Sequence, residues 1–238
     1  MRGDTSSVKR LEERSARQTR IEKAAEQVFA SRGVAFATMD DIARQSGVSK
    51  GALYLHFESK EQLYLTLAVR ALRELLSRLE ALPQKGTGYE RIRAVLETYA
   101  RFSVSDPARF RLAAAWLSHD WHFQKHEPLA VEYAEVIKLA LNLAVDAFEL
   151  GKRDGTVQPH LDTQLTILHT ISGIHGVSEL HARMVEEPDQ VAPQIDSDIW
   201  RDLLTSHGSA PLQPSRERLI SSHVELLLAA IKSQPCAP

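Results

Sequence analysis

The segment from Thr38 to Lys60, TMDDIARQSGVSKGALYLHFESK, constrains the fold more than any other part of the chain. Its polar and glycine residues predict two short helices separated by a sharp turn. Thr38 can cap the first helix, and acidic residues follow in its first turn, where the helix dipole favours negative charge. Gly47 can end that helix, and Ser49 can cap the second. The segment therefore predicts a helix-turn-helix.

The second of these helices has one face suited to close approach. Projected at about 100° per residue, Leu53 and Phe57 fall together on the side that meets the core. The other side carries Gly51, Ala52 and Leu55 in the middle, flanked by Tyr54 and His56. Small residues with hydrogen-bonding groups at the edges suit the floor of the DNA major groove. The helix start beside Lys50 could bind a phosphate.

The longer run from Arg17 to Leu67 resembles the N-terminal domain of the TetR family of transcriptional regulators. The shared pattern is a glycine after the first helix, a threonine at the start of the second, and then Ile-Ala…Gly-Val-Ser-Lys-Gly-x-Leu-Tyr-x-x-Phe-x-Ser-Lys-Glu-x-Leu. The resemblance implies a homodimer that binds a palindromic DNA operator through two recognition helices in successive major grooves. It also implies an effector pocket in the C-terminal body whose occupation releases the DNA, as in a repressor.

The resemblance and the exposed helix face together give a set of candidate DNA-binding residues. They are Thr38, Ser49, Lys50, Gly51, Ala52, Tyr54, Leu55, His56 and Lys60. Tyr54 and Lys60 suit phosphate contacts, whereas Lys50 lies nearer the bases. Leu55 departs from the aromatic or polar residue common in the family and suggests an apolar contact such as a thymine methyl. Taken singly, Tyr54 could be a packing residue and Lys60 a solvated charge.

The charge distribution agrees with DNA binding at one end of the chain. The net charge of the 238 residues is −2, but residues 1–60 carry 11 Lys and Arg against 8 Asp and Glu. The rest of the chain is acidic. A basic end on an acidic body is the pattern expected when only one end meets phosphate.

Helical periodicity continues beyond this segment, and no stretch alternates like a strand. We expect an all-α fold in which a three-helix DNA-binding domain is joined by a long helix to a helical effector-binding and dimerisation domain. The expected divisions are a flexible arm over residues 1–15, the helix-turn-helix domain over 16–60 and the helical domain over 61–238. The long helix should run from Ser59 to Leu82. Further helices are expected at about 89–104, 107–119, 128–151, 161–185 and 215–233, with a long connection over 186–213.

The resemblance assigns the last two long helices to a dimer interface. Apolar and small residues recur on them at helical spacing: Leu165, Leu168, Ser172 and Gly176, then Val224, Leu227, Leu228 and Ile231. The alternative is that both stripes pack within one subunit.

The effector pocket that the resemblance implies would be built from helices within residues 89–185. Candidate lining residues are Phe102, Phe110, Trp116, Phe148, His169 and His175. Because no Lys and Arg cluster lies there, we expect an apolar or aromatic small molecule as effector. Pockets and ordinary cores have similar compositions, so these residues could instead be core.

The stretch from Trp116 to His126 holds two tryptophans and three histidines. On a continuous helix His119, His122 and His126 would share a face, which could bind a metal ion. The helix is expected to end near His119, which breaks that geometry, and no cysteine accompanies it. We therefore expect no metal site, and interpret the stretch as lining a pocket mouth or packing between helices.

Enzymatic function is not expected. The sequence has no glycine-rich phosphate loop, Walker motif, His-Glu-x-x-His pair or nucleophile elbow, and no cofactor is predicted. The alternatives are a helical small-molecule-binding or metal-binding protein, an enzyme without a recognisable catalytic motif, or a structural helix bundle. None of these alternatives explains why the residues of Thr38–Lys60 occur together at this spacing.

The sequence also favours a cytoplasmic location. The longest apolar stretch, Leu226 to Ile231, is too short to span a membrane, so no membrane association is expected. Met1–Lys9 lacks the apolar core of a signal peptide. Cys236 is the single cysteine, so no intrachain disulfide can form.

Overall fold

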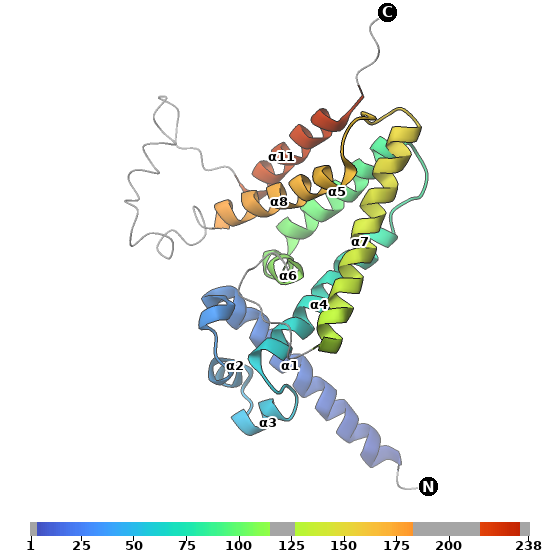
Figure 1. Cartoon of the computed structure of the whole chain (residues 1–238). Helices are drawn as coiled ribbons and strands as arrows, with labels where there is room; N and C mark the ends of the chain where they lie inside the picture. Colours follow the sequence, from blue (N-terminus) through green and yellow to red (C-terminus); the bar gives the residue numbers. More distant parts are fainter. Residues whose placement is uncertain (1–3, 115–126, 183–214, 234–238) are drawn as a thin grey trace, which may run out of the picture. The chain divides into compact units, whose positions relative to one another are not determined.

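The computed structural model describes residues 4–114, 127–182 and 215–233, and within them the regular elements are α-helices (Figure 1). The all-α class expected from the sequence is thus confirmed. The helices are α1 (Asp4–Phe36), α2 (Met39–Ser46), α3 (Lys50–Tyr54), α4 (Lys60–Glu80), α5 (Gly88–Ser105), α6 (Pro107–Ala113), α7 (Glu127–Arg153), α8 (Thr163–His181) and α11 (Arg216–Ile231).

The chain divides into two compact units. The first is Met1–Ser77 with Asp106–Ala140, and the second is Arg78–Ser105 with Leu141–Pro238. The boundaries fall inside α4 and α7, so each of these helices contributes to both units. No helix among the described residues is long and apolar enough to cross a membrane.

The first unit forms around the apolar face of α1. Ile21, Ala25 and Val28 recur at helical spacing on that face and are buried, as are Ile42 of α2 and Leu53 of α3. The regular helix of α1 is interrupted at Gly33, which has φ 71° and ψ 155°. That backbone conformation is accessible to glycine, so the helix end expected at this position is confirmed.

Residues 1–15 were expected to be a flexible arm, but from Asp4 onward the structure continues them as the first turns of α1. Its side chains are described from Val8 onward, and those up to Ser15 are exposed. The stretch lacks the apolar periodicity that marks a packed helix, which is why the sequence did not predict a helix here. Charge spacing and propensity explain the helix instead. Most of these residues, such as Leu11, Glu12 and Arg14, have high helix propensity, and Glu13 lies four residues from Lys9, a spacing that favours isolated helices.

The short helix α6 also belongs to the first unit. Asp106 caps it by accepting a hydrogen bond from the Arg109 backbone N–H at 3.0 Å, and Pro107 follows in the first turn as the sequence predicted. Phe110 is buried, and the Tyr133 hydroxyl of α7 donates to the Ala113 carbonyl at 2.6 Å. These contacts hold α6 against the start of α7.

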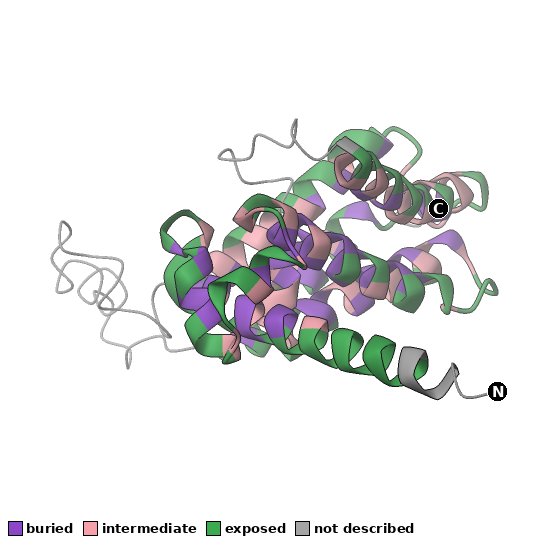
Figure 2. Ribbon diagram, turned by 90° about the horizontal axis from the view of Figure 1, so that it is seen from below, coloured by how far each residue is buried: buried purple, intermediate pink, exposed green. Residues whose placement is uncertain are grey.

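The second unit contains α5, the end of α7, α8 and α11. Gly88 and Gly151 bring α5 and α7 into backbone contact, and the Gly88 N–H donates to the Asp154 carboxylate at 2.7 Å. Helix α11 packs on both α5 and α8. Figure 2 shows the buried residues gathered along the inner sides of the helices, with exposed residues on their outer sides.

The helices of the body begin and end close to where their sequence predicts. The expected helix at 161–185 begins at Thr163, because the Asp162 carboxylate caps it by accepting from the Leu165 N–H at 2.9 Å. The helix expected at 107–119 is shorter in the structure: α6 ends at Ala113, and Ala114 is its C-cap with a non-helical φ of −94° and ψ of 14°. Residues 115–119 and the connection over 186–213 lie outside the described residues.

Candidate nucleic-acid interface

A capping box fixes the start of α2. The Thr38 hydroxyl accepts from the Asp41 N–H at 3.1 Å, and the Asp41 carboxylate accepts from the Thr38 N–H at 3.2 Å and from its hydroxyl at 2.7 Å. Arg32 and Arg44 pair with the same carboxylate at 3.1 and 3.5 Å. The hydrogen bond from the Thr38 hydroxyl is the largest cause of a lowered pKa of Asp41, and both arginines add to it.

The turn between α2 and α3 is equally well defined. Gly47 has φ 67° and ψ 25°, the left-handed conformation that ends helices, and the Val48 N–H donates to the Ala43 carbonyl at 3.2 Å. The Ser49 hydroxyl then caps α3 by accepting from the Ala52 N–H at 3.2 Å. The direction of α3 is therefore set by contacts within a few residues.

Helix α3 turns one face to the core and one to solvent, as its helical projection predicted. Leu53 and Phe57 are buried, whereas Tyr54 is exposed and Leu55 is 78% exposed. A Cβ added to Gly51 would meet nothing within 4 Å. At Gly51 no side chain projects from the outward surface, whereas Tyr54 and Leu55 project beside it. Another molecule can therefore approach the helix backbone closely at Gly51.

Two lysines flank this surface, and both have partners in the protein. Lys50 lies 2.7 Å from the Asp40 carboxylate, and this hydrogen bond is the main cause of the raised pKa of Lys50. The Lys60 ammonium donates to the backbone carbonyls of Val34 at 2.8 Å and Ala35 at 3.3 Å. Lys60 thus joins the start of α4 to the end of α1, a role that its sequence position did not reveal.

His56 lies just beyond α3 and is half-buried. Burial lowers the pKa of its imidazole, and the positive charges of Arg14 and Arg17 lower it further. His56 is therefore neutral at neutral pH. Its imidazole can donate or accept a hydrogen bond there, but it adds no positive charge to the surface.

The comparisons with known proteins agree with this geometry. The model of the family "Bacterial regulatory proteins, tetR family" matches residues 21–67, which contain α2, α3 and the helix ends that hold them. The helix-turn-helix region of the chain is thus a TetR-family domain.

Relatives and solved structures extend the likeness beyond this domain. The HTH-type transcriptional activator FasR of Mycolicibacterium smegmatis is 34% identical over 149 residues, a match that spans 62% of this chain and 64% of FasR, less than two thirds of that relative. The uncharacterized HTH-type regulator YfiR of Bacillus subtilis is 26% identical, over 75% of this chain and 96% of YfiR.

A tetR-family regulatory protein from Rhodococcus RHA1 has the same fold, with a TM-score of 0.64 and 18% identity over 92% of this chain and 98% of that one. FadR from Bacillus subtilis, solved with stearoyl-CoA, has a TM-score of 0.61 and 21% identity over 90% of this chain and 98% of that one. These likenesses show that the TetR-family fold includes the helical body.

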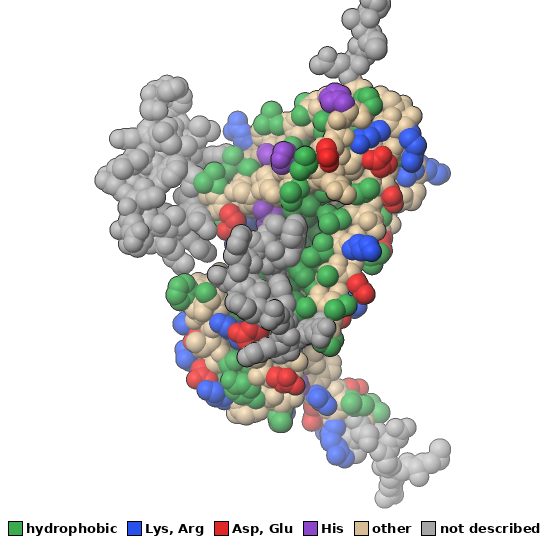
Figure 3. All heavy atoms as spheres, viewed as in Figure 1, with side chains coloured by type: hydrophobic (Ala, Val, Ile, Leu, Met, Phe, Trp, Pro, Cys, Tyr) green, Lys and Arg blue, Asp and Glu red, His purple; other side chains and the backbone are tan. Residues whose placement is uncertain are grey.

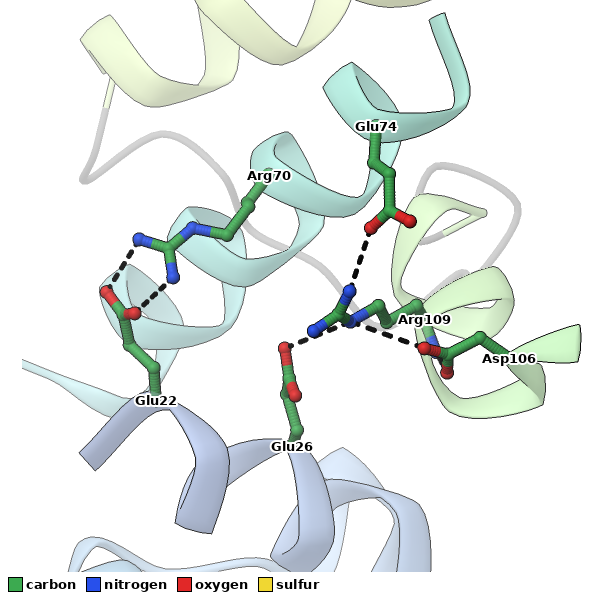
Figure 4. Close-up of polar contacts among 6 residues, drawn as sticks. All are labelled: Glu22, Glu26, Arg70, Glu74, Asp106 and Arg109. Atoms are coloured by element: carbon green, nitrogen blue, oxygen red, sulfur yellow. Dashed lines mark hydrogen bonds and ion pairs between the residues drawn. The ribbon is translucent and has the colours of Figure 1, made fainter. Parts of the chain in front are cut away.

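An ion-pair cluster in the first unit was not anticipated from the sequence (Figure 4). Arg70 of α4 binds both carboxylate oxygens of the buried Glu22 of α1. Arg109 of α6 donates to Glu74 of α4 at 2.8 Å and also pairs with Glu26 of α1 at 3.7 Å. Each pair joins residues far apart in sequence, so no local pattern signals it.

The dimer-interface candidates fall into two groups. On α8, Leu165, Leu168, Ser172 and Gly176 are exposed. On α11, Val224, Leu228 and Ile231 are buried inside their own unit and Leu227 is half-buried. The residues on α11 therefore pack within one subunit, which was the alternative to a dimer interface in the sequence analysis. The outward face of α11 instead carries Leu226, which is 68% exposed.

The effector-pocket candidates are not gathered into one described site. Phe102 and Phe148 are buried in the second unit, Phe110 is buried in the first, and His169 is exposed. Trp116 lies outside the described residues. His175 of α8 meets the Tyr99 hydroxyl of α5 at 2.9 Å, and burial lowers the pKa of this histidine to about 4.

The metal interpretation of the Trp116–His126 stretch concerns residues that the structure does not describe. Among those it does describe, no group of three or more His, Cys, Asp or Glu side chains could hold a metal ion. No catalytic constellation was expected, and the relatives reported above are named as transcriptional regulators.

Proposed function

We propose that this protein represses transcription as a homodimer that binds a palindromic DNA operator and is released by a small-molecule effector. The observation that carries the proposal is the outward face of α3. No side chain projects from this face at Gly51, and Leu55 is exposed on it. The turn that precedes α3 is fixed by the C-cap of α2 and the N-cap of α3. Such a face suits insertion into a major groove.

The nine candidate residues keep their proposed roles in this scheme. Gly51 and Ala52 allow close approach to the bases, and Leu55 offers an apolar contact to a thymine methyl. Lys50 can exchange Asp40 for a phosphate or a base edge, because both members of that ion pair are exposed. An ammonium has three donors, so Lys60 can keep its two carbonyl partners and still donate to a phosphate.

An exposed stripe on α8 supports the homodimer. Leu165, Leu168, Ser172 and Gly176 lie on one side of this helix at helical spacing, and all are exposed. A Cβ added to Gly176 would meet nothing within 4 Å, so another helix could approach closely there. Packing this face against its copy would remove apolar surface from water and provide two recognition helices.

An apolar effector is supported by the composition of the body and by relatives. The Fatty acid metabolism regulator protein of Bacillus subtilis is 24% identical over 156 residues, and the solved FadR from the same species holds stearoyl-CoA. We therefore propose a fatty acyl compound as the effector class, in preference to an aromatic one. FasR is named an activator, so a transcription assay must measure the direction of regulation as well.

The DNA-binding part is tested by a gel shift with duplex from upstream of the chain's own gene and with random-sequence duplex. The wild type should prefer the upstream duplex at physiological salt. Leu55→Glu should abolish the shift because it places a negative charge beside phosphates, without changing thermal stability. Leu139→Glu on α7 is the matched control, since Leu139 is 51% exposed in the same unit. Equal binding to both duplexes by the wild type would exclude the proposed function.

The effector part is tested by titrating stearoyl-CoA and free coenzyme A into the DNA complex. Release by the acyl form alone is the expected result. Release by both compounds, or by neither, would contradict an acyl effector while leaving DNA binding intact.

A further inference from the structure

Helix α1 is much longer than the surface it packs on. Its buried residues begin at Ile21, yet the helix starts at Asp4. All residues from Val8 to Arg20 are exposed except the half-buried Gln18 (Figure 2). At 1.5 Å per residue, residues 8–20 add a rod of about 18 Å, roughly half a turn of DNA in length.

Two arginines of this extension share one face. At about 100° per residue, Arg14 and Arg17 fall on the same side as Ile21 and Val28, the side that faces the rest of the DNA-binding unit further along the helix. Glu12 falls on the opposite side. Figure 3 shows Lys and Arg side chains among acidic and apolar ones along this part of α1. The side continuous with the packed face, called the basic side below, thus carries both arginines and lies opposite Glu12.

The basic side lies close to the candidate DNA surface. The charges of Arg14 and Arg17 both reach the imidazole of His56, which follows α3 directly. Among the described residues neither guanidinium has an ion pair or a hydrogen bond. Two guanidiniums without carboxylate partners therefore stand next to the helix that would enter the major groove.

We infer that Arg14 and Arg17 of the α1 extension bind DNA phosphates beside the major groove that α3 occupies. The inference rests on the proposed DNA-binding function and extends its interface beyond the helix-turn-helix. DNA is favoured over another polyanion because the charges of Arg14 and Arg17 reach His56, which directly follows the candidate recognition helix α3. Arginine also matches phosphate geometry with its planar set of donors. Contacts of this kind add affinity on any sequence rather than specificity.

The test compares variants of the full chain that lose the same charge from different sides of α1. Arg14→Gln with Arg17→Gln removes two charges from the basic side. Lys9→Gln with Lys23→Gln removes two from exposed positions turned away from it. Arg14→Lys with Arg17→Lys keeps the charge. Binding to a random-sequence duplex is measured over a range of salt concentrations, and circular dichroism checks that each variant melts like the wild type.

Each lost phosphate contact should lower the slope of log K against log salt by about 0.9, so the Arg14, Arg17 glutamine variant should lose about 1.8 per protomer. The lysine variant should retain most of the slope, and the Lys9, Lys23 variant should match the wild type. An unchanged slope in the Arg14, Arg17 glutamine variant, or an equal loss in both glutamine variants, would overturn the inference.

The two proposals fail separately. If the wild type does not prefer its upstream duplex to random duplex, the regulator proposal itself fails. If the wild type shows that preference and the Arg14, Arg17 glutamine variant keeps the wild-type salt slope, only the role of the α1 extension is excluded.

Discussion

The Lys60 ammonium at the start of α4 donates a hydrogen bond to the Val34 carbonyl at the end of α1, at 2.8 Å. The same ammonium reaches the Ala35 carbonyl at 3.3 Å. Both carbonyls follow Gly33, where the helical backbone conformation of α1 is interrupted. A lysine at this position can therefore stabilise the fold and, with its third donor, bind a phosphate.

Lys60→Ala should show both roles. Loss of the two hydrogen bonds should lower the free energy of unfolding by about 1 kcal/mol, since the site is only half-buried. Loss of one phosphate contact should lower the salt slope of DNA binding by about one per protomer. Chemical denaturation and gel shifts at several salt concentrations measure the two effects. Lys23→Ala, which removes an exposed lysine of α1, is the control. A salt slope that is the same in Lys60→Ala as in wild type would exclude the phosphate contact.

The cap of α2 should make stability depend on acid pH. The Asp41 carboxyl has a pKa below 3.8, its ordinary value, so it stabilises the fold above pH 3.8. That contribution is lost as the pH falls from 3.8 through the folded pKa. Thr38→Val removes the largest cause of the lowered pKa. The variant should be less stable than wild type at neutral pH, and the difference should shrink on acidification.

Urea denaturation at a series of pH values measures this difference. Thr19→Val is the control, because the Thr19 hydroxyl donates to the Ser15 carbonyl within α1 and caps no helix. A difference between Thr38→Val and wild type that stays constant down to pH values well below 3.8 would contradict the assigned role of Asp41.

The helix-turn-helix could be predicted from sequence because its contacts are local. Thr38 bonds to a residue three positions away, Ser49 does the same, and Gly47 adopts the backbone conformation that its lack of a side chain allows. Side-chain spacing along the chain records such contacts directly. The same is true of Asp106 and Pro107 at the start of α6.

Contacts between distant residues and unpaired helix faces could not be predicted in this way. Arg70 and Glu22 are 48 residues apart, and nothing near either one indicates the other. The α1 extension has no apolar stripe because it packs on nothing in its unit. On α11, Val224 and Leu226 are both apolar, and only the packing of the helix shows that the first is buried and the second exposed.

Gly88 at the start of α5 should tolerate no larger residue. A Cβ added there would lie 1.9 Å from the Gly151 backbone nitrogen. Only a movement of the backbone could relieve this clash. Gly88→Ala should lower the free energy of unfolding by about 3 kcal/mol. Gly176→Ala in α8 is the control, since its Cβ would meet nothing within 4 Å and should not destabilise the isolated subunit. Differential scanning calorimetry that found Gly88→Ala as stable as wild type would contradict the close approach of α5 and α7.

The proposed dimer interface can be tested at Leu168, which is 46% exposed on α8. Leu168→Glu should place two carboxylates opposite each other across a symmetric interface and remove apolar surface from it. Like charges brought together out of water are strongly unfavourable, so the variant should sediment as a monomer. Because Leu168 is exposed in the single subunit, helix content should be unchanged.

Leu139→Glu is the matched control for this change, because Leu139 is similarly exposed but lies on α7 in the first unit. Sedimentation velocity should give the mass of a dimer for wild type and Leu139→Glu, and half that mass for Leu168→Glu. The monomeric variant should also bind its operator more weakly, because each subunit would then have to bind a half-site alone. A Leu168→Glu variant that remained dimeric would place the dimer interface elsewhere on the chain.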